Sequence, residues 1–370
     1  MTNSANNESK ANWELPPESG ERSVSFFEFW PASVMYGPVL WQWLWLALRH
    51  RSLTLPLIAN PRLTMAGLVG ARKSELMAQA HGRCAAAILP WVNRVIDAQP
   101  AANQAAELAK KAHASDIHFP MVCKPDIGCR GAGVKLVHSL AQLTDAMAAY
   151  PIGASVLCQK LASYEPEVGI FFVKRPGAAG QITSLTFKYS PAVVGDGVRT
   201  LRQLVACNPR AGQLLHLYRT RWAARWDSVI ASGERVKLVF SASHCRGAVF
   251  RDARAHITPE LSASVNAILA DLPDYHYGRL DVKFADLPAL RAGVGLEIVE
   301  INGASAESIH IWDRNAGFFA ALGTLQWQYR TLFELGAYQR TQGHRPPGLR
   351  ALYQSWQIER RLRAHYPSTD

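Results

Sequence analysis

Runs of alternating apolar and polar residues mark the expected strands of this chain. Residues 277–285 (YGRLDVKFA) and 295–303 (GLEIVEING) alternate over most of their length, which is typical of a strand with one buried face. Shorter apolar runs predict further strands at 119–125, 154–161, 167–175, 181–189, 235–243 and 247–253. The predicted strands therefore lie mainly in the middle of the chain.

Helical patterns separate these strands. The helices that the patterns and capping residues predict lie at 71–82, 101–114, 139–150, 200–208, 210–232 and 259–272, with mostly helical structure beyond 305. We expect Ser74 near the start of the first and Gly82 at its end, and Ser139 as the cap of the third. Residues 52–61 (SLTLPLIANP) predict a short buried strand. This mixture predicts an α+β fold without internal repeats.

An apolar segment near the start of the chain stands apart from this pattern. Residues 34–48 contain no charged residue and carry three tryptophans, Trp41, Trp43 and Trp45. The segment is shorter than the ~20 residues that a membrane-spanning helix needs. It ends in Arg49-His50-Arg51, so an interfacial helix on anionic lipid is one interpretation of residues 34–51. A buried helix of the first lobe, or half of a homodimer interface, is the other.

Composition restricts the class of protein more than the function. The chain has 370 residues, 48% of them hydrophobic, which is enough for two or three lobes. Residues 1–24 are polar and predict a disordered leader without the apolar region of a signal peptide. The six cysteines form no C-x-x-C pair, which favours a reducing cytoplasm over a zinc or disulfide protein. The net charge of +11 indicates anionic partners, but no nucleic-acid motif is present, so we expect no nucleic-acid partner.

A glycine loop follows the predicted strand at 119–125. The stretch FPMVCKPDIGCRGAGVKLV places Lys124, Arg130 and three glycines within nineteen residues. Glycines let backbone N–H groups approach a ligand closely, and the two cations add positive charge, a combination that suits phosphate. A plain hairpin turn is the alternative that this stretch alone leaves open.

Two carboxylates and an amide are expected to meet on the last two strands. Arg279, Asp281 and Lys283 share one face of the first strand, and Glu300 and Asn302 share one face of the second. If residues 286–294 form the connecting loop, antiparallel pairing sets Asp281 opposite residue 299 or 300. Hard oxygen ligands of this kind suit Mg²⁺ bound together with phosphate. Solvated charges on a surface hairpin are the alternative.

In this order, these stretches resemble the ATP-grasp superfamily of carboxylate–amine ligases. PAVVGDGVRTLRQL (191–204) is similar to the ligase domain of cyanophycin synthetase and its glutathione-synthetase relatives, and R-L-D (279–281) with E-I-N (300–302) to D-alanine–D-alanine ligases. The resemblance covers roughly residues 65–310. It implies an ATP-grasp fold in which two α+β lobes grip ATP, preceded here by an atypical tryptophan-rich segment.

The resemblance also implies domains. They are a leader (1–24), an N-terminal lobe (25–115), a small lid subdomain (116–190), a large subdomain with the metal site (191–320) and a C-terminal helical extension (321–370).

The resemblance implies a role for each site residue. Residues that bind ATP would be Lys73, Lys124, Gly128, Arg130, Gly131, Gly133, Gln159, Lys160, Leu161 and Glu167. Among them, Gln159 falls where relatives contact the adenine amino group, Lys160 and Leu161 offer backbone to the adenine edge, and Glu167 reaches the ribose or adenine. Catalytic residues would be Arg279, which steadies the acyl phosphate, and Lys188, which reaches phosphate. Ligands of Mg²⁺, as one or two ions with Mn²⁺ as a substitute, would be Asp281, Glu300 and Asn302.

The activity implied is the ATP-dependent joining of a small-molecule carboxylate to an amine through an acyl phosphate, with release of ADP and phosphate. Two alternatives stay open: an ATP-grasp kinase that acts on a hydroxyl or phosphate acceptor, and a membrane-docking protein that binds nucleotide without turnover. The sequence GASAESIH after Asn302 departs from the proline-glycine turn of the relatives, and Glu307 within it is a candidate for holding the amine. We expect a cytoplasmic protein, with peripheral attachment to the inner face of the membrane if residues 34–51 contact lipid.

Overall fold

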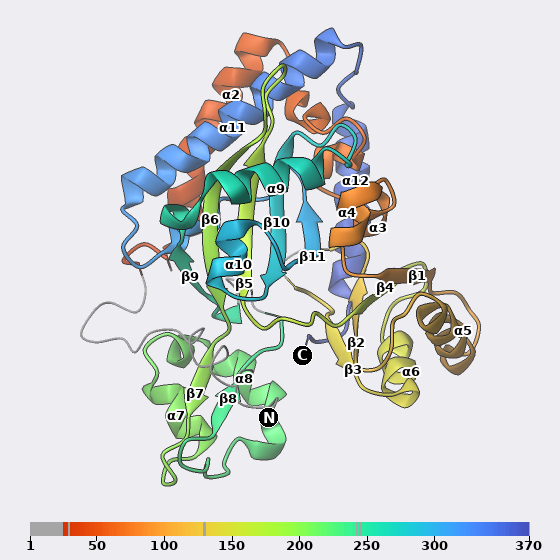
Figure 1. Cartoon of the computed structure of the whole chain (residues 1–370), viewed down its shortest axis with the longest axis vertical. Helices are drawn as coiled ribbons and strands as arrows, with labels where there is room; N and C mark the ends of the chain where they lie inside the picture. The colour runs from red at the N-terminus through yellow and green to blue at the C-terminus, as the bar shows by residue number, and fades with distance from the viewer. Residues whose placement is uncertain (1–24, 29, 129–130, 242, 244–245, 370) are drawn as a thin grey trace.

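The computed structural model describes residues 25–28, 30–128, 131–241, 243 and 246–369, and places their strands in three antiparallel sheets (Figure 1). The predicted leader lies outside the described residues, as does Arg130. The strands are β1 (Trp91–Val95), β2 (Met121–Pro125), β3 (Lys135–Val137), β4 (Ser155–Lys160), β5 (Glu167–Val173), β6 (Gln181–Tyr189), β7 (Ala192–Val194), β8 (Arg235–Lys237), β9 (Val249–Asp252), β10 (Tyr277–Phe284) and β11 (Leu296–Asn302). The predicted α+β class is confirmed.

Helices cover these sheets. The α-helices are α2 (Ala32–His50), α3 (Lys73–Met77), α4 (Gly82–Ala87), α5 (Ala101–Ala114), α6 (Leu140–Ala148), α7 (Leu201–Cys207), α8 (Leu215–Arg221), α9 (Pro259–Leu269), α10 (Leu287–Ala292), α11 (Phe318–Thr341) and α12 (Leu349–Ala364). Single 3-10 turns are η1 (Leu55–Ile58), η2 (Thr64–Gly67), η3 (Ala211–Leu214), η4 (Ala223–Arg225), η6 (Arg254–His256) and η7 (Ile309–Trp312).

The four-stranded sheet has the order β1-β4-β2-β3 and carries α5 and α6. Leu108, Leu143 and Val156 are fully buried between the helices and the sheet. The side chain of Ser139 accepts a hydrogen bond from the backbone N–H of Gln142, so its predicted role as the cap of α6 is confirmed. This sheet brings the strand before the glycine loop next to β4.

The five-stranded sheet has the order β11-β10-β5-β6-β9. One face is apolar, and Leu280 and Val282 share a core there with Leu261 of α9. The other face is divided, because Phe171 and Tyr277 pack against α11 at one end while Asp281, Glu167 and Lys188 form a polar region. This sheet joins strands from the predicted ranges 116–190 and 191–320, so its hydrogen bonds cross that boundary.

Two further units complete the chain. The two-stranded sheet β7-β8 packs with α7 and α8 in a core of its own, and Thr200 forms a capping box with Gln203 at the start of α7. At the opposite end in Figure 1, α2 lies along α11, where Phe333 packs against Leu46 and Ala47. In the described part of the chain, no helix is both long enough and apolar enough to cross a bilayer.

Several sequence predictions were wrong in detail. The strand predicted at 52–61 contains η1 instead, because Pro56 has no N–H for a sheet ladder and the N–H of Leu57 closes a turn on the carbonyl of Thr54 (3.0 Å). The helix predicted at 71–82 is two short helices, with Gly82 at the start of α4 rather than at the end of a helix. The connection 286–294 contains α10, which Asp286 caps. The region 210–232 is broken into η3, α8 and η4.

Candidate active site

The polar face of the five-stranded sheet carries the predicted carboxylate cluster. The register pairs Asp281 with Glu300 and Arg279 with Asn302 across β10 and β11, so the predicted pairing is confirmed. The amide nitrogen of Asn302 donates to Asp281 Oδ2 at 3.4 Å. The four side chains therefore lie together on one face of the sheet, on the edge strand β11 and its neighbour β10.

Arg279 is held in a fixed orientation by Asp281. Its Nε donates to Asp281 Oδ1 at 2.9 Å and its Nη2 to Oδ2 at 3.2 Å, while Nη1 donates to the backbone carbonyl of Glu307 at 3.2 Å. Burial alone would raise the pKa of Asp281, but the charges of Arg279 and Lys188 outweigh it and hold that pKa below its usual value. The pair is thus fully ionised, and the guanidinium fork is oriented before any ligand binds.

A row of alternating charge continues along the sheet from Asp281. Lys188 of β6 lies 3.5 Å from Asp281 Oδ1 and forms an ion pair with Glu167 of β5. Lys283 of β10 contacts the other oxygen of Glu167 at 3.2 Å. Burial opposes ionisation of Glu167, yet the two lysines hold its pKa low; likewise burial opposes the charge on Lys188, but the carboxylates raise its pKa. Glu167 and Lys188 accordingly stay charged.

Lys124 approaches this cluster from the four-stranded sheet. Its ammonium is buried and donates to Gln159 Oε1 at 2.7 Å and to the backbone carbonyl of Val299 at 3.2 Å. No carboxylate of the described residues lies within ion-pair distance of it, and burial lowers the pKa of Lys124 to about 8, although Glu300 acts in the opposite direction. A buried ammonium without an anionic partner is costly and favours an anionic ligand.

Lys73 reaches the same place from the start of α3. Its Nζ donates to the carbonyl of Gly128 at 2.8 Å and lies 3.6 Å from Glu300 Oε1. Asp126, which sequence reasoning missed, holds this helix, because its carboxylate accepts from the backbone N–H of Ser74 (2.8 Å) and from the hydroxyl of Ser74 (2.6 Å). The position of Asp126, directly after Lys124-Pro125 and just before the glycine loop, was the signal available in the sequence.

The glycine loop lies next to these lysines. Gly131 and Gly133 have φ values of 70° and 72°, which other residues adopt only with strain. The carbonyl of Gly131 accepts from the hydroxyl of Thr369 at 2.7 Å, and the carbonyl of Ile127 accepts from the hydroxyl of Tyr366 at 2.7 Å. The C-terminal end of the chain therefore covers the outer side of the loop.

The predicted adenine contacts lie at the end of β4 and directly after it. Gln159 is buried, and its side chain bonds Lys124 and the carbonyl of Leu89 rather than facing an open space. The backbone N–H of Lys160 donates to the carbonyl of Pro90 at 2.9 Å, so it is already used in the sheet. Leu161 follows directly after β4 and is half-buried. Leu161 lies just beyond β4, where the chain passes from the four-stranded sheet to the five-stranded sheet.

The oxygen donors fit a magnesium ion. Among the described residues, no three His, Cys, Asp or Glu side chains form a group that could hold a metal. Asp281 and Glu300 would supply two carboxylates and Asn302 one amide oxygen; in this structure both oxygens of Asp281 accept from Arg279, and the amide nitrogen of Asn302 donates to Asp281. Mg²⁺ commonly binds through one or two carboxylates together with water and phosphate oxygens, so this incomplete set suits a metal that arrives with a nucleotide.

Glu307 links the cluster to α2. Its carboxylate accepts a hydrogen bond from the hydroxyl of Tyr36 at 2.5 Å, and its backbone carbonyl accepts from Arg279. The proposed role of Glu307 as the amine holder stays a prediction, and Tyr36 was not foreseen, since nothing in the residues around it distinguishes it from a core tyrosine. The first lobe thus contributes a side chain to the surroundings of Arg279.

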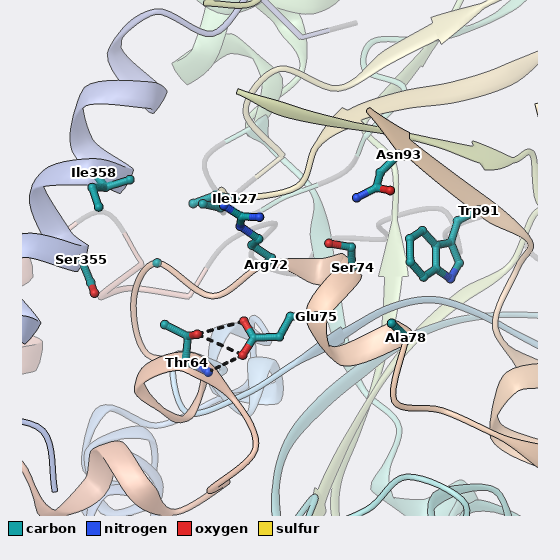
Figure 2. Close-up of a pocket in the computed structure, with 11 residues that line it drawn as sticks. Thr64, Arg72, Ser74, Glu75, Ala78, Trp91, Asn93, Ile127, Ser355 and Ile358 are labelled. Carbon is teal, nitrogen blue, oxygen red and sulfur yellow. Dashed lines mark hydrogen bonds between the residues drawn. The ribbon is translucent and has the colours of Figure 1, made fainter. Parts of the chain in front are cut away.

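A cavity of about 720 Å³ opens on another side of α3 (Figure 2). Arg72, Ser74, Glu75 and Asn93 supply its polar lining, together with the ring of Trp91 and with side chains of α12. Ile127 of the glycine-loop stretch lines it, but Lys73, Lys124, Asp281, Glu300 and Asn302 do not. It shares α3 with the site, because Lys73 follows Arg72 directly.

No protein-family model and no curated protein matches the chain. Among solved structures, the chain is similar to a bifunctional glutathione synthetase from Pasteurella multocida, with 16% identity, a TM-score of 0.34 and coverage of 67% of this chain. It spans about a third (34%) of the length of that protein. It is also similar to the D-cycloserine synthetase DcsG, with 14% identity, a TM-score of 0.36 and coverage of 71% of this chain and 70% of that chain. Both likenesses are distant, so the functional conclusion depends on the residues of the site.

Proposed function

We propose that the chain is an ATP-dependent ligase that activates a carboxylate as an acyl phosphate and joins it to an amine. The observation that carries this proposal is the buried ammonium of Lys124, which faces Glu300 and Lys73 without an ion-pair partner of its own. Such a site favours a polyanion. Because Asp281 and Glu300 lie beside it, the polyanion that fits best is a nucleotide triphosphate bound with Mg²⁺.

The reaction proceeds in two displacements. An oxygen of the substrate carboxylate attacks the γ-phosphorus of ATP, and the bond from that phosphorus to the bridging oxygen of ADP breaks. The amine then attacks the carbonyl carbon of the acyl phosphate, phosphate leaves with the bonding electron pair, and the nitrogen loses a proton. The products are an amide, ADP and phosphate.

The side chains supply charge and orientation to these steps. Lys73 and Lys124 neutralise the phosphates, which lowers the repulsion between the attacking carboxylate and ATP. Arg279, held by Asp281 and by the carbonyl of Glu307, would place its positive charge beside the oxygens of the acyl phosphate. Mg²⁺, held by Asp281, Glu300 and Asn302, would add Lewis-acid stabilisation of the phosphoryl oxygens when bound.

Hydroxylamine tests the acyl phosphate directly. The purified chain is incubated with MgATP, pooled amino acids and dipeptides, and hydroxylamine, and ADP and hydroxamates are measured by mass spectrometry. A ligase yields ADP that depends on the added acid, together with the hydroxamate of that acid. A phosphoester product without hydroxamate would instead make the chain a kinase and refute the proposal.

Matched lysine variants control this assay. Lys124→Met removes the ammonium at the site, whereas Lys110→Met removes an exposed ammonium on α5. Only the first should lose ADP formation. Equal loss in both variants, or in neither, would contradict the role given to Lys124.

A further inference from the structure

The side of α2 that faces away from α11 is apolar along its length. Its exposed large side chains are Val34, Leu40, Trp41, Leu44, Trp45 and Leu48, which we call the α2 face. Trp41 is 75% exposed and Leu48 80%. No charged residue lies between Ala32 and Leu48. The helix therefore buries one side on the protein and presents an equally apolar side outward, at the edge of the molecule in Figure 1.

Aromatic side chains extend the α2 face beyond the start of the helix. Phe26 and Trp30 are half-exposed and their rings lie 5.4 Å apart, edge to face. The ring of Trp30 lies 5.5 Å from that of Phe318, which in turn contacts Phe319, and Phe319 is 83% exposed. Exposed apolar side chains in this number mark an interaction site.

Cationic side chains flank the α2 face at its other end. Arg49 and Arg51 are exposed, and the guanidinium of Arg49 lies 5.6 Å from the ring of Trp45. α2 itself contains no acidic residue. The nearest carboxylate of α11, Glu334, is paired with Arg175 at 3.3 Å. The charge next to the apolar surface is therefore positive.

We propose that the α2 face docks the protein on an anionic lipid surface, with the helix parallel to the membrane plane. The leucines and tryptophans would enter the boundary between headgroups and acyl chains, where the amphipathic indole is favoured. Arg49 and Arg51 would meet lipid phosphates, and the stacked position of Arg49 on Trp45 keeps both at the same depth.

A second copy of the chain fits this surface less well. In an antiparallel pair of α2 helices, Arg49 and Arg51 would meet the start of the partner helix, whose first turn has no acidic residue and whose dipole is positive there. In a parallel pair, the same arginines would face their own copies. Both arrangements lack the negative charge that an anionic membrane supplies.

Docking would also bring the candidate active site close to the membrane. Tyr36, on the protein side of α2, bonds Glu307, which holds Arg279. The docking proposal itself does not depend on the proposed ligase activity, because it needs only the folded chain and lipid.

Vesicle sedimentation tests the proposal with the full chain. We use vesicles of phosphatidylcholine alone, and of phosphatidylcholine mixed with an equal amount of phosphatidylglycerol, over a range of salt concentrations. The chain should sediment with the anionic vesicles, and less of it should sediment as the salt concentration rises.

Two pairs of substitutions test the residues of the α2 face. Trp41→Ser with Trp45→Ser should abolish sedimentation. Because an arginine near an anionic surface contributes a factor of about five in binding, Arg49→Gln with Arg51→Asn should weaken it about twenty-five-fold. Asn is chosen because Arg51 has a φ of 51°.

Matched variants elsewhere on the surface control for exposure and charge. Ile152→Ser with Val198→Ser removes exposed apolar side chains, and Arg202→Gln with Arg291→Gln removes exposed cations; neither pair should change sedimentation. Thermal melting confirms that every variant is folded. The proposal is overturned if the wild-type chain binds neither kind of vesicle, or if it binds both equally at all salt concentrations. It is also overturned if the wild-type chain is a dimer that does not bind lipid and the tryptophan substitutions convert it to a monomer.

Discussion

The affinity for ATP should fall steeply with rising pH because of Lys124. Burial lowers the pKa of this ammonium to about 8 in the free protein, well below its ordinary value of 10.5. Phosphate binds the protonated form, since only that form carries charge. Lys188 and Arg279 stay charged over the same range, because the pKa values of both are raised. Lys124 is thus the group of the site expected to change its charge between pH 7 and 9.

The size of the effect follows from that pKa. At pH 7 about nine-tenths of the Lys124 side chains are protonated, and at pH 9 about one-tenth, so the dissociation constant for MgATP should rise about tenfold between them. Above pH 9 it should rise about tenfold per pH unit. The second pKa of a phosphate monoester is about 6, so the charge of the nucleotide changes little between pH 7 and 9.

Calorimetric titration with a non-hydrolysable ATP analogue measures both the affinity and the protons bound. At pH 8 about half a proton should be taken up for each nucleotide bound, as titrations in two buffers of different ionisation enthalpy report. Lys124→Met should bind weakly at every pH without this uptake, and Lys110→Met should behave as wild type. A wild-type dissociation constant that is unchanged between pH 7 and 9 would refute the reasoning, and so would a pH dependence that Lys124→Met retains.

Further substitutions test other parts of the site. Asp281→Asn and Glu300→Gln should each lower Mg²⁺-dependent ADP formation on the order of a hundredfold or more, because each removes a carboxylate of the metal set; near wild-type turnover in either would remove the assignment. Asp126→Ala should weaken nucleotide binding by releasing the start of α3, and a binding constant equal to that of wild type would exclude this role. Gly278→Ala should destabilise the fold by about 3 kcal/mol in chemical denaturation, because its Cβ would lie 1.9 Å from the carbonyl of Asn302; an unchanged midpoint would show that β10 can shift.

Alternation along two strands was enough to predict the centre of the site. Because the side-chain period of a strand is two and the connection is short, the positions of Asp281 and Glu300 follow from the sequence once the strands are paired. The same local information explains why the cap at Ser139 could be predicted, since a cap involves residues only three apart. These features depend on contacts that are close in the sequence.

Long-range contacts explain what the sequence did not reveal. Asp126 acts through Ser74, which lies 52 residues away along the chain, and Tyr36 reaches Glu307 across 271 residues. Gln159 was expected to face adenine, but its side chain is used by Lys124 from the neighbouring strand. No periodicity encodes such pairs, because they arise only when separate elements pack together.

The burial of the tryptophan-rich segment also could not be predicted from the sequence. The sequence left two interpretations, a buried helix and a surface helix, and the structure contains parts of both: Trp43 packs against Phe333 and donates to the carbonyl of Leu53, whereas Trp41 and Trp45 are exposed. A helix that is apolar on every side carries no polar stripe to indicate which side is buried. The packing of α2 against α11 determines which side is buried. We propose that the opposite, exposed side contacts lipid. On the protein side of that helix, the hydroxyl of Tyr36 donates to the carboxylate of Glu307, whose backbone carbonyl accepts from Arg279, so α2 and the candidate site contact the same residue.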